Sequence, residues 1–492
     1  MTNDRDESMQ PVTPVTYDRR AIIPGIVHIG VGNFHRAHEA FYVDRLLRMG
    51  IAATWGISGI GIMPADARMR DALRSQDLEY TLIERHPSGI DHATRIGAIV
   101  EYLYAPDELD RVLERLAAPS TRIVSLTVTE GGYNISDATG EFDAGAPAVV
   151  ADARPGAKPS TVFGIVTAGL RRRRDRGVPP FAVLSCDNVQ ANGAVARNSF
   201  VAFATMADPE LAAWMRDNVA FPNAMVDRIT PVTTDADRRW VRERFGIDDA
   251  WPVVTESFAQ WIVEDDFPNG RPRLDQVGVQ LVDDVRPYEL MKLRLLNASH
   301  QAMAYFGLMK GEVYVEGAAS DPQLIELMTR YMNEEATPTL EPVPGVDLDA
   351  YKLELLERFA NPHVGDTLAR LATDGSDRIP KFVVPVARER RAAGEDAPLS
   401  AAIIASWARY AALVTTGGAD LPFADRQRER IEHAVARQRT DLSGFLRDPD
   451  WFGDLADDAR FAADFARAYS LMTDGPDISA ALRLTLSGSL IQ

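Results

Sequence analysis

The chain has 492 residues, of which 46% are hydrophobic and 25% charged, and its formal net charge is −18. This length exceeds one compact core and predicts two domains. A single cysteine, Cys186, excludes an internal disulfide and a cysteine-based zinc site. The negative charge disfavours nucleic acid as a partner. A polar N-terminus and the lack of any apolar run of roughly 18 residues predict a cytoplasmic protein that does not enter the membrane.

The first part of the chain alternates apolar strand-like runs with helix-like segments. The strand-like runs are 25–32, 53–62, 121–130 and 180–188, and the helix-like segments include 34–50 and 161–175. Continuous apolar strands alternating with helices indicate a parallel sheet covered on both faces. The basic run Arg171–Arg174 ends one of these helices just before Gly177, where basic side chains complement the helix dipole.

From about residue 285 the pattern changes to helices joined by loops rich in Pro, Gly and Asp. The sequence therefore predicts an α/β fold class with a Rossmann-type parallel-sheet domain over residues 1–284. A mainly α-helical C-terminal domain is predicted over residues 285–492. Ligand sites tend to form where domains join, and this boundary lies just before Lys292.

A glycine-containing turn, "GVGNFHRAH", follows the first predicted strand. Gly30 and Gly32 stand where a parallel sheet brings backbone N–H groups toward a pyrophosphate, and Asn33 and Phe34 complete the candidate cofactor-binding turn. The same glycines could serve only a tight strand-to-helix turn. Arg36 occupies the position of a third glycine in the common fingerprint, and its side chain would either reach the phosphates or cover the turn.

An acidic residue after the second strand is the next sign of a dinucleotide site, because it bonds the ribose hydroxyls. Asp66 fills that place. Arg68 and Arg70 are near, but no basic pocket lies directly beside the acid. The pattern therefore favours NAD over NADP.

The helix-like segment "KLRLLNASH" places Lys292, Asn297 and His300 among leucines, and at 3.6 residues per turn we expect them on one broad side. Burial lowers the pKa of an ammonium, so that a buried lysine becomes a base, and an asparagine amide donates to an oxyanion. Asn188, at the end of a predicted strand, is suited to be a second donor. The alternative is structural: Lys292 paired with Glu289, and the other two bonded within their helix.

Eight dispersed motifs, in the same order from about residue 20 to 480, extend this picture. They are "GVGNFHRAH", "SLTVTEGGY", "SCDNVQANG", "FPNAMVDRITP", "GIDDAWPVV", "QWIVEDDFPNGRP", "YELMKLRLLNASH" and "DGSDRIPKF". Together they resemble the polyol-specific long-chain dehydrogenases, the mannitol dehydrogenase family. The resemblance implies a Rossmann-type domain that binds NAD, a helical domain that supplies a base, and no metal.

The resemblance also implies roles for individual residues. Lys292 would be the general base that takes the proton of the substrate's C2 hydroxyl, Asn188 and Asn297 the oxyanion donors, and Glu289 part of the path by which the proton leaves. Substrate contacts are implied for His300, Arg370, Asp227 and Arg378, and ribose binding for Asp66.

The implied reaction is the NAD-dependent, reversible oxidation of a polyol, D-mannitol to D-fructose. Fructuronate reductases and D-arabinitol dehydrogenases of the same family are the alternatives. The reductases typically read "TEKGY" and "FPCTMVDR" and lack an arginine at the place of Arg370, so this sequence favours the polyol enzyme. Two departures from the usual sequence of the family are Ala65, where an acid that weakens NADP binding is often found, and Arg378, where a lysine is common.

A hypothesis of another class is a catalytically silent NAD-binding protein that senses redox state. The set of polar residues on one helix disfavours it, because a sensor needs neither a buried base nor oxyanion donors. The expected partner is a small polyol or ketose, with no nucleic acid and no membrane. We expect the chain to act as a monomer.

Overall fold

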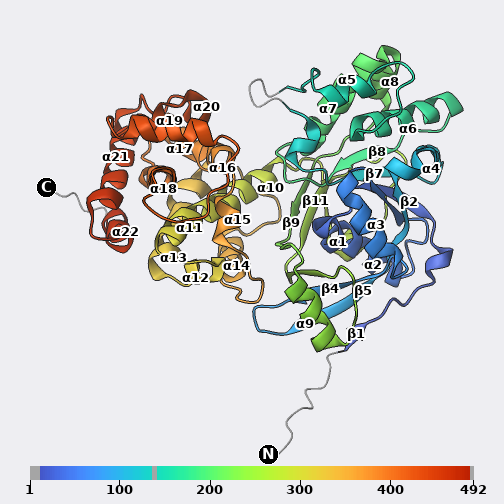
Figure 1. The fold of residues 1–492 in the computed structure, drawn as a ribbon, viewed down its shortest axis with the longest axis horizontal. Helices are drawn as coiled ribbons and strands as arrows, with labels where there is room; N and C mark the ends of the chain where they lie inside the picture. The colour runs from blue at the N-terminus through green and yellow to red at the C-terminus, as the bar shows by residue number, and fades with distance from the viewer. Residues whose placement is uncertain (1–10, 136–140, 488–492) are drawn as a thin grey trace, which may run out of the picture. The chain divides into compact units, whose positions relative to one another are not determined.

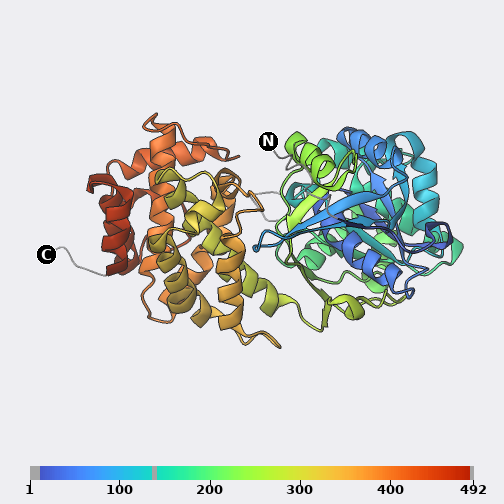
Figure 2. The same cartoon turned by 90° about the horizontal axis from the view of Figure 1, so that it is seen from below.

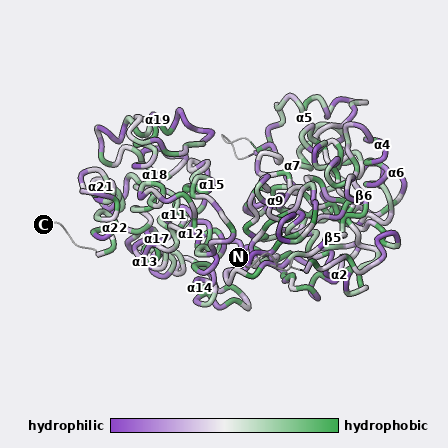
Figure 3. Tube along the Cα trace, turned by 60° about the horizontal axis from the view of Figure 1, so that its bottom comes forward, coloured by the Kyte–Doolittle hydropathy of each residue, from purple (hydrophilic) through white to green (hydrophobic). Residues whose placement is uncertain are grey.

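The structure is a computed structural model and describes residues 11–135 and 141–487. Contacts between Cα atoms divide the chain into two units, residues 1–286 and 287–492. The first mixes strands and helices, and the second, coloured yellow to red, is built from helices (Figures 1 and 2). Figure 3 shows apolar and polar residues interleaved along the trace. Within the described residues, no helix has the length and apolar character that a membrane span requires.

The central sheet of the first unit has five parallel strands in the order β6-β3-β2-β7-β8. These strands are β2 (Pro24–Ile29), β3 (Gly56–Gly61), β6 (Ile99–Tyr104), β7 (Ile123–Leu126) and β8 (Ala182–Ser185). Most of their residues are buried, as expected for a sheet covered on both faces. The strand order reverses between β2 and β7, and α/β sheets bind ligands beyond the carboxyl ends of the strands at such a switch point.

Two smaller sheets and nine α-helices complete the described part of the first unit. One sheet, in the order β1-β5-β4-β10, consists of β1 (Val12–Thr13), β4 (Tyr80–Arg85), β5 (Asp91–Ile96) and β10 (Val253–Glu256); the other, β12-β11-β9, consists of β9 (Ala224–Asp227), β11 (Gln260–Glu264) and β12 (Gln280–Val282). The helices are α1 (Asn33–Ala37), α2 (Glu39–Arg48), α3 (Ala67–Arg74), α4 (Ala105–Ala117), α5 (Pro147–Asp152), α6 (Val162–Arg176), α7 (Asn192–Ala207), α8 (Pro209–Asn218) and α9 (Asp235–Phe245).

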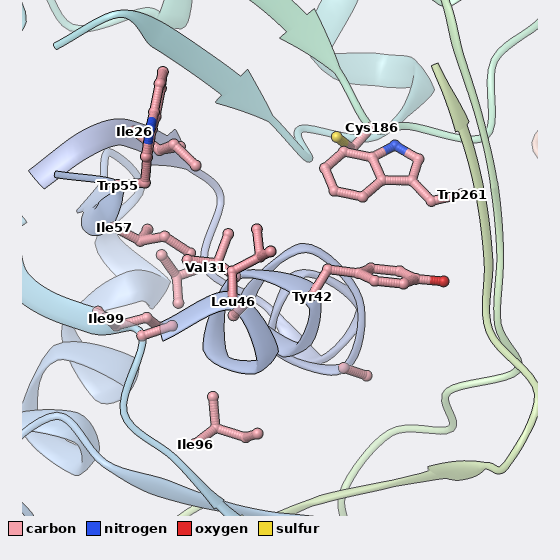
Figure 4. Close-up of a cluster of buried hydrophobic side chains, with 14 of the residues drawn as sticks. Ile26, Val31, Tyr42, Leu46, Trp55, Ile57, Ile96, Ile99, Cys186 and Trp261 are labelled. Atoms are coloured by element: carbon pink, nitrogen blue, oxygen red, sulfur yellow. The ribbon is translucent and has the colours of Figure 1, made fainter. Parts of the chain in front are cut away.

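Side chains alternate between two hydrophobic cores along the central strands, as the pleat requires. Ile26 and Ile57 belong to the core that α2 covers, whereas Val27 and Ile60 belong to the core that α4, α6 and α7 cover. Figure 4 shows the first of these cores, which includes Cys186. The alternation explains why these strands read as continuous apolar runs in the sequence.

The basic run at the end of α6 lies where the sequence predicted it. Thr161 caps the start of the helix by accepting a hydrogen bond from the Gly164 N–H, and Gly177 closes it in the left-handed conformation. Arg173 is buried and donates to three backbone carbonyl groups. The run therefore holds neighbouring segments as well as complementing the helix dipole.

The first predicted helix is wrong as a single element, because the chain breaks at His38 into α1 and α2. Distant side chains take the carbonyl groups that would continue the helix. The Tyr80 hydroxyl donates to the Arg36 carbonyl at 2.5 Å, and Arg228 Nη1 donates to the Ala37 carbonyl at 2.6 Å. Tertiary hydrogen bonds thus override the local helix preference.

The second unit confirms the predicted helical half. Its helices are α10 (Arg286–Met291), α11 (Ala298–Met309), α12 (Val315–Ala318), α13 (Pro322–Arg330), α14 (Leu348–Phe359), α15 (Leu368–Ala372), α16 (Gly375–Phe382), α17 (Val384–Ala392), α18 (Pro398–Thr415), α19 (Arg428–Gln438), α20 (Pro449–Phe452), α21 (Ala459–Asp474) and α22 (Ile478–Ser487). Two π-helical segments, η5 (Lys292–Asn297) and η6 (Tyr331–Ala336), interrupt this pattern and contact each other.

Candidate active site

The turn after β2 needs glycine at Gly30. This residue has φ +99°, and a Cβ atom there would lie 2.1 Å from the Thr127 carbonyl oxygen. Thr127 Oγ1 donates to the Gly30 carbonyl at 2.7 Å and fixes the turn against the end of β7. The turn is therefore bare backbone at the switch point of the sheet. That arrangement fits a pyrophosphate, which must approach the backbone closely.

The side chains of Asn33 and Arg36 support the turn from inside. Arg36 is fully buried and donates to the Gly32 carbonyl, the Trp251 carbonyl and Asn33 Oδ1. Burial lowers the pKa of Arg36 to about 10. Asn33 Nδ2 donates to a loop at Thr233 Oγ1, 2.9 Å away. Of the two alternatives for Arg36, covering the turn is the one the geometry supports, because a fully buried guanidinium presents nothing to a ligand.

The ring of Phe34 stacks on the His38 ring, with their centroids 5.0 Å apart. Its packing keeps the first turn of α1 against the body of the unit. The part of the turn left for a ligand is thus its backbone between Gly32 and Phe34.

Asp66 follows β3 in a short 3-10 turn, Pro64–Asp66. Its Oδ2 accepts hydrogen bonds from the Ile62 and Met63 N–H groups at 2.9 and 2.8 Å, which closes the loop. Arg70 is engaged elsewhere, since it pairs with Asp71 and Asp107.

The ends of β8 and β9 carry the other two candidates of the first unit. Asn188 lies just past β8 and is exposed, whereas Asp227 ends β9 and is buried. Cys186, two residues before Asn188, is buried in the core, and desolvation raises the pKa of its thiol well above the usual value. A thiol in that state is a packing group.

His28, His35 and Glu39 are buried beneath the glycine turn, and they form the one group of metal-ligating side chains found among the described residues. The two imidazole rings stack, with centroids 3.5 Å apart and planes at 12°. Their in-plane lone pairs thus lie in nearly parallel planes and do not converge on one ion. His28 Nδ1 also lies 2.8 Å from Ser125 Oγ, whose hydroxyl donates to Glu39. His28 and Glu39 thus belong to a hydrogen-bonded support, whereas neither ring nitrogen of His35 has a hydrogen-bond partner among the described residues.

The prediction of a regular helix over Lys292–His300 is wrong in one respect, because Lys292–Asn297 is π-helical. In an α-helix, five residues would leave Lys292 and Asn297 about 140° apart around the axis. The i→i+5 hydrogen bonding of a π-helix brings residues five apart close to one above the other. The π turn therefore produces the shared side that regular periodicity could not.

Four candidates on this helix are buried. Glu289, Lys292, Asn297 and His300 are each 7–8% exposed. Arg294, within the π turn, donates to Glu389 through both Nη atoms, at 2.7 and 2.6 Å. A bidentate ion pair of this kind fixes the rotation of the turn about its axis.

His300 is neutral and has an open ring nitrogen. Its Nε2 is buried with no hydrogen-bond partner within residues 11–135 and 141–487. Desolvation lowers the pKa of His300 well below its usual value, and the charges of Arg370, Arg358, Arg378 and Lys292 lower it further. A neutral imidazole with an open ring nitrogen can exchange a hydrogen bond with a substrate hydroxyl.

Arg370 and Arg378 lie on α15 and α16, near His300. Arg370 forms an ion pair with Asp366, four residues earlier and just before α15, with Nε to Oδ1 at 2.6 Å. Arg378 Nη1 donates to the Leu371 carbonyl at 3.2 Å. The second unit thus gathers Lys292, His300 and these two arginines in one neighbourhood.

Two residues with a bearing on the site were missed from the sequence. Asp187 directly precedes Asn188 and bonds the loop after β7, and a carboxylate beside a candidate donor at a strand end is a signal that could have found it. Arg358 acts on His300 from α14. The amphipathic sequence of α14 contains no signal for that role.

Comparison with known proteins bears on the whole chain. Residues 24–276 match the family model described as the mannitol dehydrogenase Rossmann domain, and residues 284–473 match the mannitol dehydrogenase C-terminal domain. A mannitol 2-dehydrogenase from Phaeosphaeria nodorum is 43% identical over 95% of this chain and 82% of its own length. One from Cereibacter sphaeroides is 44% identical over 93% of this chain and 95% of its own.

Two solved structures are similar over nearly their full lengths. A Pseudomonas fluorescens mannitol 2-dehydrogenase, in ternary complex with NAD and D-mannitol, matches with a TM-score of 0.88 and 42% identity, covering 98% of each chain. A D-sorbitol dehydrogenase in substrate-free form matches with a TM-score of 0.87 and 37% identity, covering 98% of this chain and 100% of that one.

Proposed function

Because the chain belongs to the mannitol dehydrogenase family, we propose that it catalyses reversible hydride transfer between NAD and a polyol. Oxidation of D-mannitol to D-fructose is the leading reaction. NAD, when bound, accepts the hydride that leaves C2 of the polyol. The similar Pseudomonas fluorescens enzyme, solved with NAD and D-mannitol, supports this choice of cofactor and substrate.

The observation that carries the mechanism is the π turn that aligns buried Lys292 with buried Asn297. Burial in a low dielectric disfavours a charged ammonium, which is the condition for a lysine to act as a base. The Lys292 amine takes the proton of the C2 hydroxyl, and the electron pair of that O–H bond forms the C2–O double bond as the hydride departs. The Asn297 amide donates to the oxygen while negative charge develops on it.

Other residues complete the proposed roles. Asn188 is the second oxyanion donor, and Glu289 relays the proton from Lys292 to solvent. The neutral His300 ring accepts a hydrogen bond from a substrate hydroxyl, and Arg370 and Arg378 donate to others. Asp227 forms part of the polar wall, a role suited to its buried position at the end of β9.

The cofactor roles fall on the turn after β2 and on the loop after β3. The bare backbone at Gly30 and Gly32 lets the pyrophosphate approach, and the N–H groups that follow Gly32 donate to it. Asp66 bonds the adenosine ribose and favours NAD. Ala65, which carries no charge, leaves that preference weaker than a pair of acids would.

The test is a panel of ketoses, D-fructose, D-fructuronate, D-tagaturonate and D-xylulose, each assayed with NADH and with NADPH. We expect the highest kcat/KM with D-fructose and NADH. Faster reduction of D-fructuronate would replace the proposal with fructuronate reductase, and faster reduction of D-xylulose with arabinitol dehydrogenase. No turnover with any of the four would favour the silent NAD-binding protein instead.

A further inference from the structure

Thr129, three residues beyond the end of β7, has a backbone conformation that is essentially confined to glycine. Its φ is +65° and its ψ is 169°, and a side chain in this region strains the backbone. The Thr129 side chain is exposed. The hydrogen bonds of Thr129 use its backbone, with its carbonyl accepting from the Gly132 N–H at 2.9 Å. The strain therefore has to be balanced through the backbone.

The buried carboxylate of Asp187 supplies that balance. Its Oδ1 accepts a hydrogen bond from the Thr129 N–H at 2.8 Å, and its Oδ2 accepts from the Val128 N–H at 3.1 Å. The Tyr133 hydroxyl donates to the same Oδ2 at 2.7 Å. Asp187 is 7% exposed and Tyr133 1%. One buried carboxylate thus holds the strained residue, the residue before it, and the end of the turn that follows.

Asp187 is itself held from the other side. Its carbonyl accepts from Asn192 Nδ2 at 3.0 Å, and the same side-chain amide exchanges two hydrogen bonds with the Ala224 backbone, at 2.7 and 2.9 Å. Asp187 therefore links the end of β7 to the end of β8, and through Asn192 to the start of β9. Asn188 is the next residue along the chain.

This linkage lies one strand away from the switch point between β2 and β7. Thr127, just before the strained segment, bonds the Gly30 turn on the neighbouring strand. Strained backbone persists only where its surroundings over-determine it, and it gathers at functional sites. A purely structural clamp would not need to hold a threonine where glycine is the favoured residue.

We propose that Asp187 is a positioning residue: it keeps the Val128–Thr129 peptide in its strained conformation and thereby sets the place of Asn188 for hydride transfer. The inference rests on the proposed function for the role of Asn188. Asp187 does not itself touch the reacting atoms in the proposed reaction. It acts through the backbone at the ends of β7 and β8.

The test begins with Asp187→Asn, which keeps the shape of the side chain and replaces one hydrogen-bond acceptor by a donor. Small displacements at a reacting centre cost up to about 10²-fold in rate, so we expect kcat to fall about 10- to 100-fold. We expect KM for the polyol and the Kd for NADH to change less than about threefold. An unchanged kcat would overturn the positioning role.

A second variant removes the backbone strain at Thr129 and leaves intact the clamp, which is the pair of hydrogen bonds from the Val128 and Thr129 N–H groups to Asp187. Thr129→Gly adopts the same backbone conformation without steric cost, so we expect its kcat to stay within about twofold of the parent. In the double variant with Asp187→Asn, glycine should recover at least part of the lost kcat, because residues that act on one segment are coupled. Equal losses in the single Asp187→Asn variant and the double variant would overturn the inference.

Asp152→Asn is the matched control. Asp152 also accepts hydrogen bonds from two backbone N–H groups, those of Ser160 and Thr161 at 2.8 and 2.7 Å. These two amides lie just before α6 and not in the segment after β7. This variant should lower Tm with kcat unchanged. If Asp152→Asn lowered kcat as much as Asp187→Asn does, the contacts of Asp187 would be no more than general stabilising contacts, and the positioning role would be rejected.

Hydrogen exchange separates failure of this inference from failure of the proposed function. The Val128 and Thr129 amides donate to Asp187, so their exchange should accelerate in Asp187→Asn and not in Asp152→Asn, whatever substrate the protein turns over. Unchanged exchange at both amides would overturn the clamp. Faster exchange in a chain that reduces none of the four ketoses would retain the clamp and reject the polyol reaction.

Discussion

The carboxyl edge of the five-stranded sheet and the π turn of the second unit hold their polar groups in opposite ways. At the sheet edge, the side chain of Arg36 is bonded to the Trp251 carbonyl and to Asn33, and the side chain of Asp187 is bonded to the Thr129 N–H, so both side chains support backbone. Near the π turn, His300 keeps a buried nitrogen with no partner among the described residues, and cations surround it. The first arrangement suits a cofactor of constant shape, and the second suits hydroxyls that differ between substrates.

The largest effect should follow from Lys292→Ala, which removes the proposed base of the second unit. We expect kcat to fall about 10³- to 10⁴-fold, because general base catalysis is typically worth 10² to 10⁴, while NADH still binds. Steady-state kinetics and an NADH fluorescence titration measure the two effects. The control is Lys352→Ala, since Lys352 is as buried as Lys292 but donates to Asn333. Near-normal turnover in Lys292→Ala would remove the assignment.

Asn188→Ala and Asn297→Ala compare one donor from each region. Each should lower kcat roughly 10²- to 10³-fold, the cost of losing an oxyanion donor. The measurement is the rate of hydride transfer in the first turnover, followed by rapid mixing. If only Asn297→Ala slows hydride transfer, Asn188 is not an oxyanion donor, and the sheet edge contributes only to cofactor binding.

Gly30→Ala should destabilise the turn after β2 at the sheet edge. The new Cβ would meet the Thr127 carbonyl at 2.1 Å in a left-handed conformation, so we expect a loss of about 3 kcal/mol or more in the free energy of unfolding. Gly177→Ala is the matched control, because Gly177 is also left-handed, at φ +66°, but has open space around it. That control should cost about 1 kcal/mol. Equal costs, measured by chemical denaturation, would show that the close approach is unimportant.

Glu335 tests how the second unit tolerates a buried charge. Its carboxylate accepts from the Leu399 and Ser400 N–H groups and from Ser400 Oγ, at the start of α18. Desolvation raises the pKa of Glu335 to about 7. Because the folded pKa lies above the unfolded one, the stabilising contribution is complete below about pH 4.5 and is lost as pH rises through 7.

Glu335→Gln removes this titration. Between pH 5 and pH 8 we expect the parent to lose on the order of 2 kcal/mol of unfolding free energy relative to the variant. Denaturation curves of both proteins at the two pH values provide the measurement. The same pH dependence in parent and variant would contradict the raised pKa.

The smallest effect should come from His300→Asn. We expect KM for the polyol to rise about 10-fold, the value of one hydrogen bond, with a smaller change in kcat. Because the pKa of His300 is well below its usual value, its protonation should leave no step in the pH profile of kcat/KM above about pH 6. A step that disappears in His300→Asn would show instead that the ring titrates in the working range.

The fold class could be predicted from the sequence, because strands such as β2 and β7 are unbroken apolar runs and α6 has a capping threonine and a closing glycine. Prediction from the sequence failed at His38, where the break depends on a hydrogen bond to the Ala37 carbonyl from Arg228, 191 positions farther along the chain. Local patterns contain no trace of such a contact.

At the candidate site, the sequence predicted which residues to consider, but it did not predict how they are arranged. The motif around Lys292 is typical of an ordinary leucine-rich helix, and no local pattern in it predicts a π turn. The burial of Arg36 and the pairing of Arg370 with Asp366 likewise depend on packing. The roles of Asn188, Glu289 and Asp227 rest on the resemblance to the family and stay predictions.

The π turn has a further consequence for the helix that contains it. Relative to a plain α-helix, a π turn accommodates one additional residue, so the segment after Asn297 is out of phase with the segment before Lys292. Every residue of α11 from Ala298 to Leu308 is buried, and this core helix tolerates no rotation. Removing one residue from the turn would therefore leave α11 in place and swing Lys292 away by about 100°. The number of residues here is as much a part of the chemistry as their identity, and a shortened homologue with the same side chains should be inactive.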